Sequence, residues 1–322
     1  MRAVVIGTDG TFGLRQRPDP VAGPGEVVIR VRAAGLNAAD LQQARGNYPA
    51  PAGWPSDVPG LEVAGEVEQV GVGATGATAG DRVMALVGGG GHAERIAVPA
   101  DLLLPVPATL SWEEAAGFPE AFSTAWDALV GQAQVRAGDR VLVTGAAGGV
   151  GTAAVQVAAV SGADVVASVR RPELHEQVKA LAGAAVEVIT PDQEARSGPY
   201  DIIVDLVGGD DYLTRVTWLR PCGRLLMLGL LAPPPATVPT AWLGALMLNR
   251  CRLIGSTIRG RTHPEKAILA RAMAAVVPLL ADVRLRVPVD SAFPLDRCCD
   301  AYDRLAGPGK LGKIVLTTEP PR

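Results

Sequence analysis

The chain has few cysteines and no concentration of basic residues. Four of its 322 residues are cysteines, Cys222, Cys251, Cys298 and Cys299, and no two of them have the CxxC spacing. The sequence therefore predicts neither a disulfide framework nor a structural zinc site. The net charge is -3, with arginines and lysines scattered along the chain, which argues against binding to nucleic acid or acidic membranes. We expect reduced thiols and a small-molecule partner.

The N-terminal segment lacks the features of a targeting signal. In MRAVVIGTDGTFGLRQ a short apolar run leads straight into glycine and aspartate, which predicts neither a signal peptide nor a membrane span. We therefore expect a cytoplasmic protein. The length suits about two domains, and the hydrophobic share of 48% supplies ample core material.

The first third of the chain has the pattern of an all-β domain. Short β-branched runs are separated by Gly, Pro and Asp turns: EVVIRVRAAGL, VAGEVEQVG, GDRVMALV and AERIAVPA. These runs predict a compact, barrel-like domain.

From about Ser111 the pattern changes to helices that alternate with apolar strands. A helical stretch, SWEEAAGFPEAFSTAWDALV, comes first, and the strands follow at helix-length intervals: RVLVTG, DVVASV, VEVIT, YDIIVDLVG, GRLLMLG and RLIGST. Continuously apolar strands are buried on both faces, so this part predicts a doubly wound parallel sheet covered by helices. After another helix, PEKAILARAMAAVVPLLA, the strand GKIVLTT is expected to return to the first domain.

A glycine cluster lies between the first of these strands and its helix. In VLVTGAAGGVGTAAVQVAAV the spacing Ala146-x-Gly148-x-x-Gly151 resembles a dinucleotide fingerprint with Ala in the first glycine position. Gly148 would let the backbone approach a pyrophosphate, and Gly151 would let the helix pack on the strand. The alternative is a tight turn without a ligand.

Two arginines end the next strand, about 20 residues further on, where NAD-binding proteins carry an acid that bonds the ribose 2′-hydroxyl. Here DVVASV is followed by Arg170 and Arg171. A guanidinium pairs with a 2′-phosphate, which a carboxylate would repel, so we expect NADPH as the cofactor. The alternative is a solvated pair at a loop tip.

Several motifs in order resemble the medium-chain dehydrogenase/reductase superfamily, and specifically its zinc-free quinone oxidoreductase branch. They are GLNAADLQQARGNYPAPAG, PGLEVAGEVEQVG, GDRVMAL, FPEAFSTAWDAL, AGDRVLVTGAAGGVGTAAVQVA, DLVGG and GKLGKIVL. The resemblance implies an α/β protein with a GroES-like β-barrel catalytic domain at residues 1–117, completed by about 263–322, and a Rossmann NADPH-binding domain at residues 118–262. We also expect a homodimer joined through the edge of the Rossmann sheet.

Residues that bind catalytic zinc in the metal-dependent relatives are missing. Asn37 stands in place of a cysteine and Leu61 in place of a histidine. A catalytic zinc needs about three N or S ligands, and the first domain offers only His92, which we expect to be a surface or packing residue. We expect no metal, and we interpret Glu62 and Glu66 as strand residues with structural partners.

Tyr48 and Asn37 are the candidate catalytic residues. Tyr48 matches the tyrosine that lines the nicotinamide pocket of quinone reductases, and its hydroxyl could stabilise an oxyanion; the alternative is a tyrosine that caps a loop. The Asn37 amide could bond a substrate oxygen or the cofactor carboxamide, or it could satisfy turn backbone. The resemblance assigns the remaining cofactor contacts to Thr124, Gly148, Gly149, Val150, Val207, Gly229, Leu230, Thr257 and Lys310.

The sequence thus predicts an NADPH-dependent, zinc-independent reductase of quinones or related conjugated carbonyls. Hydride delivery to such electron-poor acceptors does not need a Lewis acid. A second hypothesis is an enoyl reductase that acts on an acyl thioester or a biosynthetic intermediate. A third, from another class, is an RNA-binding or crystallin-like structural protein, against which the acidic charge balance argues.

Overall fold

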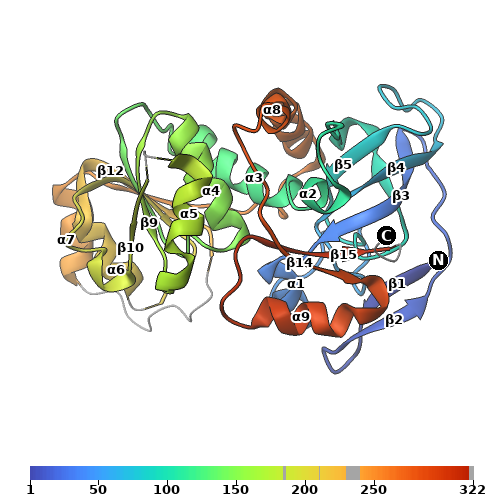
Figure 1. Cartoon of the computed structure of the whole chain (residues 1–322), viewed down its shortest axis with the longest axis horizontal. Coiled ribbons are helices and arrows are strands. Elements are labelled where there is room, and N and C mark those ends of the chain that lie inside the picture. The colour runs from blue at the N-terminus through green and yellow to red at the C-terminus, as the bar shows by residue number, and fades with distance from the viewer. Residues whose placement is uncertain (184–185, 210, 230–239, 319–322) are drawn as a thin grey trace. The chain divides into compact units, whose positions relative to one another are not determined.

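The computed structural model describes residues 1–183, 186–209, 211–229 and 240–318. It divides into two compact units. A discontinuous unit contains residues 1–123 and 258–322, and a central unit contains residues 124–257 (Figure 1). The mixed α/β fold that the sequence predicts is confirmed: one unit is built on a mainly antiparallel sheet and the other on a parallel sheet.

The discontinuous unit contains a seven-stranded sheet. Its order is β14-β15-β3-β4-β5-β7, and β6 pairs with β3. The bounds are β3 Glu26–Gly35, β4 Glu62–Val70, β5 Arg82–Leu86, β6 Arg95–Pro99, β7 Leu103–Pro105, β14 Val289–Pro294 and β15 Lys313–Thr317. The strand GKIVLTT returns to this sheet as expected, since β15 pairs antiparallel with β3. A separate hairpin, β1 (Arg2–Ile6) with β2 (Phe12–Gln16), is not among the predicted strands.

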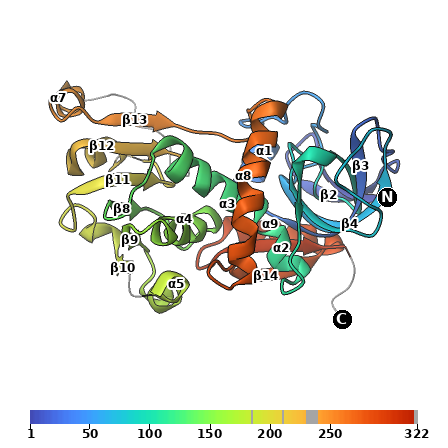
Figure 2. The ribbon, with the colours of Figure 1, turned by 90° about the horizontal axis from the view of Figure 1, so that it is seen from above.

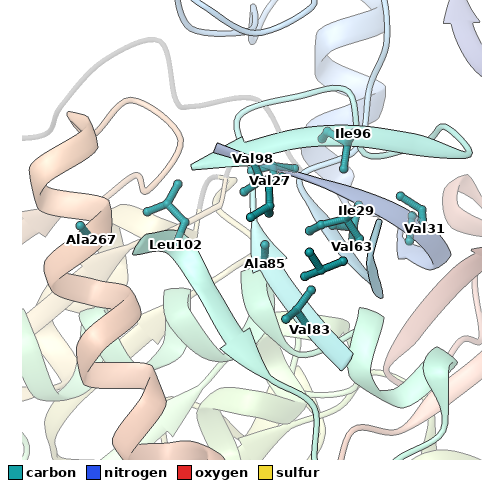
Figure 3. Packing of buried hydrophobic residues seen from close by; sticks show 13 residues of the cluster. Val27, Ile29, Val31, Val63, Val83, Ala85, Ile96, Val98, Leu102 and Ala267 are labelled. Atoms are coloured by element: carbon teal, nitrogen blue, oxygen red, sulfur yellow. The ribbon is translucent and has the colours of Figure 1, made fainter. Parts of the chain in front are cut away.

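Alternating valines and isoleucines build the core of this sheet. Val27, Ile29 and Val63 are each 0% exposed. Figure 3 shows them in one cluster with Leu102 and with Ala267 of helix α8 (His263–Ala281). Helix α8 begins at a capping box that Thr262 and Glu265 form, which satisfies N–H groups of its first turn.

The helical stretch that begins at Ser111 is not continuous. It forms α2 (Trp112–Ala116) and α3 (Pro119–Trp126), followed by a π-helical segment, Asp127–Gln132. The break falls before Pro119, which has no N–H to donate and is favoured at the first position of a new helix. The end of α3 and the π-helical segment belong to the central unit. The discontinuous unit also contains α1 (Ala38–Ala44) and α9 (Cys298–Ala306).

The central unit has a six-stranded, parallel sheet in the order β10-β9-β8-β11-β12-β13, the order of a doubly wound dinucleotide fold. Figure 2 lets the reader follow this order from β10 to β13. The strands are β8 Arg140–Val143, β9 Asp164–Ser168, β10 Val186–Ile189, β11 Tyr200–Asp205, β12 Leu219–Met227 and β13 Arg252–Gly255. The helices are α4 Gly149–Val160, α5 His175–Ala182, α6 Asp211–Arg215 and α7 Thr240–Leu248.

Candidate active site

The predicted phosphate loop lies between β8 and α4, with Gly148 as the N-cap of the helix. A Cβ atom on Gly151 would lie 2.3 Å from the Gly145 carbonyl oxygen, so only glycine lets α4 approach the strand this closely. The N–H groups of Gly149, Val150 and Gly151 have no acceptor within the helix because they belong to its first turn. These donors, with no acidic residue in that turn, fit an anionic pyrophosphate.

The loops that follow β8, β11 and β12 meet at the carboxyl edge of the parallel sheet. A Cβ atom on Gly145 would lie 3.2 Å from a methyl group of Val207, and one on Gly229 would lie 2.4 Å from the Leu206 carbonyl oxygen. The structure therefore brings Val207 and Gly229 close to the phosphate loop. Thr257 follows β13 at the same edge and is exposed, whereas Leu230 lies outside the described residues.

A buried ionic network, which sequence reasoning missed, fixes this edge. Arg215 contacts Asp205 at 2.9 Å and Glu194 at 3.2 Å. Asp205 also accepts hydrogen bonds of 3.0 Å from the backbone N–H groups of Val207 and Gly208. Glu194 accepts a hydrogen bond from Ser168, the last residue of β9. The network thus joins the end of β9 to the loop after β11.

The two arginines at the end of β9 have different environments. Arg171 pairs with Glu173 at 3.1 Å. Arg170 is exposed, and within the described residues no hydrogen bond or ion pair engages its guanidinium. Of the two, Arg170 is therefore the one whose donors are available to a ligand.

In the discontinuous unit, Asn37 belongs to a cluster of Asn37, Glu62, Glu120 and Lys313, called here the acid–lysine cluster. The Lys313 ammonium lies 2.6 Å from the Glu62 carboxylate and donates to the Asn37 side-chain oxygen at 2.7 Å and to the Leu36 carbonyl oxygen at 2.8 Å. The Asn37 amide nitrogen donates to Glu62 at 2.9 Å. Asn37 is also the N-cap residue of α1. Both polar atoms of its side chain are engaged by Lys313 and Glu62, so this side chain already serves the protein itself.

Glu120, near the start of α3, joins the acid–lysine cluster through its backbone. Its backbone N–H donates to Glu62 at 2.8 Å. Burial, with a further contribution from the charge of Glu62, raises the pKa of the Glu120 carboxyl to about 7. This carboxyl therefore titrates near neutrality. Neither Glu120 nor Lys313 was predicted from the sequence, and the one available signal was a lysine at the start of an apolar strand.

Tyr48 is held by Arg259, the second residue of the segment that follows the central unit. The guanidinium donates to the Tyr48 carbonyl oxygen at 2.7 Å and lies 5.1 Å from the centre of its ring. It also donates to the side chain of Gln43 at 2.5 Å. Arg259 is 3% exposed, so the segment that carries Tyr48 is anchored from inside this unit.

His92 is a packing residue, in line with one of the two expected roles. It is fully buried, with Nε2 3.1 Å from the Gly35 carbonyl oxygen and Nδ1 2.6 Å from the Tyr302 hydroxyl. Because a carbonyl only accepts, Nε2 carries the proton and Nδ1 accepts from Tyr302. Both ring nitrogens are therefore used.

The remaining residues that the sequence singled out lie on several elements. Thr124 lies on α3 and is half-buried, and Lys310 donates to the Gly307 carbonyl oxygen at 2.9 Å. Glu62 and Glu66 both have structural partners, as expected: Glu66 pairs with two arginines of β3. Over the part of the chain that the structure describes, no group of three or more His, Cys, Asp or Glu side chains could hold a metal ion. Nor does any helix in those ranges have the length and apolarity to cross a membrane.

Comparison with known proteins identifies the family. Residues 23–108 match the model of the alcohol dehydrogenase GroES-like domain, and residues 162–316 match that of the zinc-binding dehydrogenase. The synaptic vesicle membrane protein VAT-1 homolog of Rattus norvegicus is 31% identical over 95% of this chain and 81% of its own length. Acryloyl-coenzyme A reductase of Metallosphaera sedula is 30% identical over 99% of this chain and 100% of its own length.

Solved structures agree with this assignment. The quinone oxidoreductase of Thermus thermophilus, solved alone and in complex with NADPH, is 36% identical, with a TM-score of 0.82 over 98% of this chain and 100% of that one. Together with the two sheets and the phosphate loop, these matches confirm the resemblance that the motifs indicated. The chain belongs to the medium-chain dehydrogenase/reductase superfamily of oxidoreductases.

Proposed function

We propose that this protein is an NADPH-dependent reductase of quinones or related conjugated carbonyls that works without zinc. The preference for NADPH is inferred from the guanidinium of Arg170 at the end of β9. No described residue engages this group, and Arg170 occupies the position where an acid would select NADH. A charge-assisted contact with the 2′-phosphate of NADPH would satisfy this group. The quinone oxidoreductase from Thermus thermophilus, whose complex is with NADPH, supports the same cofactor.

The acid–lysine cluster supports a reaction without zinc. At the two positions where zinc-dependent relatives carry cysteine and histidine, this chain has Asn37 and the buried Leu61. The ammonium of Lys313 already supplies a cation between Asn37 and Glu62. A metal ion there would have to displace that ammonium, and among these residues it would find the carboxylates of Glu62 and Glu120 but no thiolate or imidazole.

The residues of the chain have separate tasks in this mechanism. The bound cofactor supplies a hydride, which an electron-poor quinone or enone accepts. The first turn of α4 binds the pyrophosphate and Arg170 binds the 2′-phosphate, which together fix the position of the cofactor. Arg259 holds Tyr48 by its carbonyl oxygen and ring, so that the phenol can stabilise negative charge on the acceptor oxygen.

The cofactor preference is tested by the affinities of purified variants for NADPH and NADH, measured by fluorescence titration. We expect Arg170→Ala to lower the ratio of NADPH to NADH affinity at least about tenfold, the effect of losing roughly 1.4 kcal/mol. Arg171→Ala should have a smaller effect because Arg171 is paired with Glu173. Arg196→Ala, an exposed arginine of the same unit, is the matched control. An unchanged ratio in both test variants would make the assignment of NADPH wrong.

The acceptor class is tested by NADPH consumption with phenanthrenequinone, a simple enone and crotonyl-CoA, alongside metal analysis of the protein. Turnover of the quinone or enone by zinc-free protein supports the proposal. Stoichiometric zinc, or a loss of turnover when a chelator removes it, contradicts the zinc-free mechanism. Tyr48→Phe should lower the turnover number if the hydroxyl stabilises the acceptor oxygen, and an unaltered rate would remove that role.

An enoyl reductase that acts on an acyl thioester is the second candidate. It is favoured by the similarity to acryloyl-coenzyme A reductase, which extends over 99% of this chain. A clear preference for crotonyl-CoA over the quinone would support it.

We further propose a homodimer that forms at the β13 edge of the parallel sheet. β13 is the last strand in the order of described strands. Apolar side chains are exposed around it. On the strand itself, Leu253 is 40% exposed, and on α7 the exposed fractions are 55% for Leu243, 72% for Met247 and 78% for Leu248. A second copy would cover them. Light scattering should report a dimer for the wild type and a monomer for Leu248→Glu, and a monomeric wild type would refute the proposal.

A further inference from the structure

Two cysteines of the central unit lie at the same end of neighbouring strands. Cys222 belongs to β12, and Cys251 directly precedes β13. The two strands pair in parallel, with Arg224 opposite Arg252. Extending this register by one residue places Gly223 opposite Cys251, so Cys222 is one position away from it. Both cysteines lie in the described ranges and carry free thiols.

One carbonyl group contacts both cysteines. The Asn249 carbonyl oxygen accepts a hydrogen bond of 2.7 Å from the Cys222 backbone N–H and lies 3.8 Å from the Cys251 sulfur. The N–H of Gly223, the residue after Cys222, donates to the same sulfur. Because adjacent strands lie about 4.8 Å apart, the Cα atoms of the two cysteines are about 6 Å apart, within the roughly 4.4–6.8 Å that disulfides span.

The end of α7 holds Cys251 in place. The Arg250 N–H donates to the Met247 carbonyl oxygen at 3.1 Å. The Cys251 N–H donates to the Leu246 carbonyl oxygen at 3.0 Å. With the left-handed φ of 53° at Arg250, these bonds form the Schellman arrangement that ends many helices. The Cys251 side chain packs against the core of this unit, as does Leu246, so its sulfur has a fixed position.

Cys222 lies on a bulge of β12. The pairing of β12 with β11 shifts its register between Leu219 and Arg224, so the residues between them bulge out of the ladder. Cys222 follows Pro221 and has a φ of 64°, the left-handed conformation that favours glycine at this position of a turn. The backbone does not favour a cysteine here, which points to a use for its side chain. This side chain is exposed, so an oxidant in solution can reach the sulfur.

The two thiols have different environments. Burial raises the pKa of the Cys251 thiol, the Gly223 N–H lowers it, and the nearby Cys222 thiol raises it further. The interaction between the two thiols agrees with the contacts through Asn249 and Gly223. Because Cys222 is exposed and Cys251 is half-buried, Cys222 is the thiol that meets an oxidant first. Cys251 is the neighbour that can attack the oxidised sulfur.

We propose that Cys222 and Cys251 form a reversible disulfide when the protein meets a peroxide. The Cys222 thiolate attacks one oxygen of hydrogen peroxide. An S–O bond forms, the O–O bond breaks, and the leaving hydroxide takes up a proton to become water, which leaves a sulfenic acid. The Cys251 thiolate then attacks this sulfur, the S–S bond forms, and the hydroxide that leaves also becomes water. The two thiols together lose two electrons and two protons, and these reduce the peroxide to two molecules of water.

The bond would join the bulge of β12 to the start of β13. Both cysteines lie at the amino ends of these strands, whereas the phosphate loop follows the carboxyl end of β8. The disulfide therefore forms away from the phosphate loop. Since the cross-link restricts the unfolded chain, it should stabilise the segment that contains β12, α7 and β13.

The test treats the purified protein with a small excess of hydrogen peroxide and maps its disulfides by mass spectrometry. Trypsin cleaves after arginine but not before Pro221, so a digest without reductant should contain the peptide Val216–Arg224 linked to the dipeptide Cys251–Arg252. Dithiothreitol should separate the two peptides. If Cys222 is instead left as a thiol, oxidised to a sulfinic or sulfonic acid, or linked to a cysteine of another molecule, the proposal is overturned.

Three variants accompany the wild type. Cys222→Ser and Cys251→Ser should each lack the linked peptide. Cys299→Ser, which removes an exposed cysteine outside the pair, is the matched control and should still form it. Loss of the linked peptide in this control as well would show that another pairing is responsible, which contradicts the proposal.

Thermal unfolding shows whether the native backbone accommodates the bond. We expect the oxidised wild type to melt at least about 3 °C above the reduced protein, and peroxide should not raise the melting temperature of Cys222→Ser. An oxidised wild type that melts no higher than the reduced one would overturn the proposal. Neither measurement uses a cofactor or an acceptor, so the result does not depend on the proposed reductase activity.

Discussion

Replacing Lys313 by methionine removes the cation of the acid–lysine cluster at nearly constant volume. The ammonium is 3% exposed and the carboxylate of Glu62 is 0% exposed, with 2.6 Å between them. Without Lys313, the Glu62 carboxylate keeps only the donors of Asn37 and of the Glu120 backbone among the described residues, at 2.9 Å and 2.8 Å. The oxygens of Asn37 and Leu36 also lose a donor.

The expected cost is about 3–5 kcal/mol of unfolding free energy, the usual effect of leaving one partner of a buried ion pair alone. Such a loss is a large part of the roughly 5–15 kcal/mol that is typical of a folded domain. Urea unfolding measures it, and hydrogen exchange of the β3 and β15 amides assigns it to the discontinuous unit.

The double variant Glu62→Gln/Lys313→Met decides whether the unpaired charge is the cause. Since it removes both charges, it should recover much of the stability that Lys313→Met loses. A loss below about 1 kcal/mol in the single variant, or a double variant that is no more stable than the single one, would refute the reasoning.

Three further predictions concern single sites. Glu120→Gln should gain stability relative to the wild type as the pH rises. The pKa of Glu120 in the folded state, about 7, lies above its usual value of 4.5, so the wild type loses stability as the pH rises from 4.5 to 7. The loss is up to about 3 kcal/mol, at about 1.4 kcal/mol per pKa unit. Urea unfolding at pH 5 and pH 8 would show this, and an equal difference at both pH values would contradict it. Gly151→Ala should weaken NADPH binding at least about tenfold in a fluorescence titration, because its Cβ would lie 2.3 Å from the Gly145 oxygen and displace the phosphate loop; unchanged affinity would mean that the loop does not hold the cofactor. Tyr302→Phe should cost about 1–3 kcal/mol in urea unfolding, because it leaves Nδ1 of the buried His92 without its hydrogen-bond partner. A cost near zero would mean that this hydrogen bond does not contribute to stability.

The strands and the phosphate loop could be predicted because their signals are local. In β3, residues such as Val27 and Ile29 belong to an apolar run and are buried, and the glycines around Gly148 follow directly on an apolar strand. The break before Pro119 was missed, although the proline was visible, because apolar periodicity continues on both sides of it. The π-helical segment Asp127–Gln132 has no comparable sequence signal.

The acid–lysine cluster could not be predicted because its contacts are not local. Glu62 and Glu120 are 58 residues apart, and Lys313 is separated from Leu36 by 277 residues. No spacing rule connects positions at such distances, and each residue alone resembles an ordinary charged side chain at the start of a strand or helix. Arg259, which anchors Tyr48 from 211 residues away, escaped prediction for the same reason.

The strand β15 has a consequence for how the protein is made. It lies between β14 and β3 in the sheet, so the first 123 residues of the chain cannot complete their sheet until residues 313–317 have been synthesised. The central unit forms from one uninterrupted segment, residues 124–257, and can therefore fold while synthesis continues, since domains fold as units in the order in which they emerge. During that interval the end of β3 that pairs with β15 remains unpaired, and the carboxylate of Glu62 lacks the ammonium of Lys313. We expect nascent chains that stop before β15 to depend on chaperones for solubility.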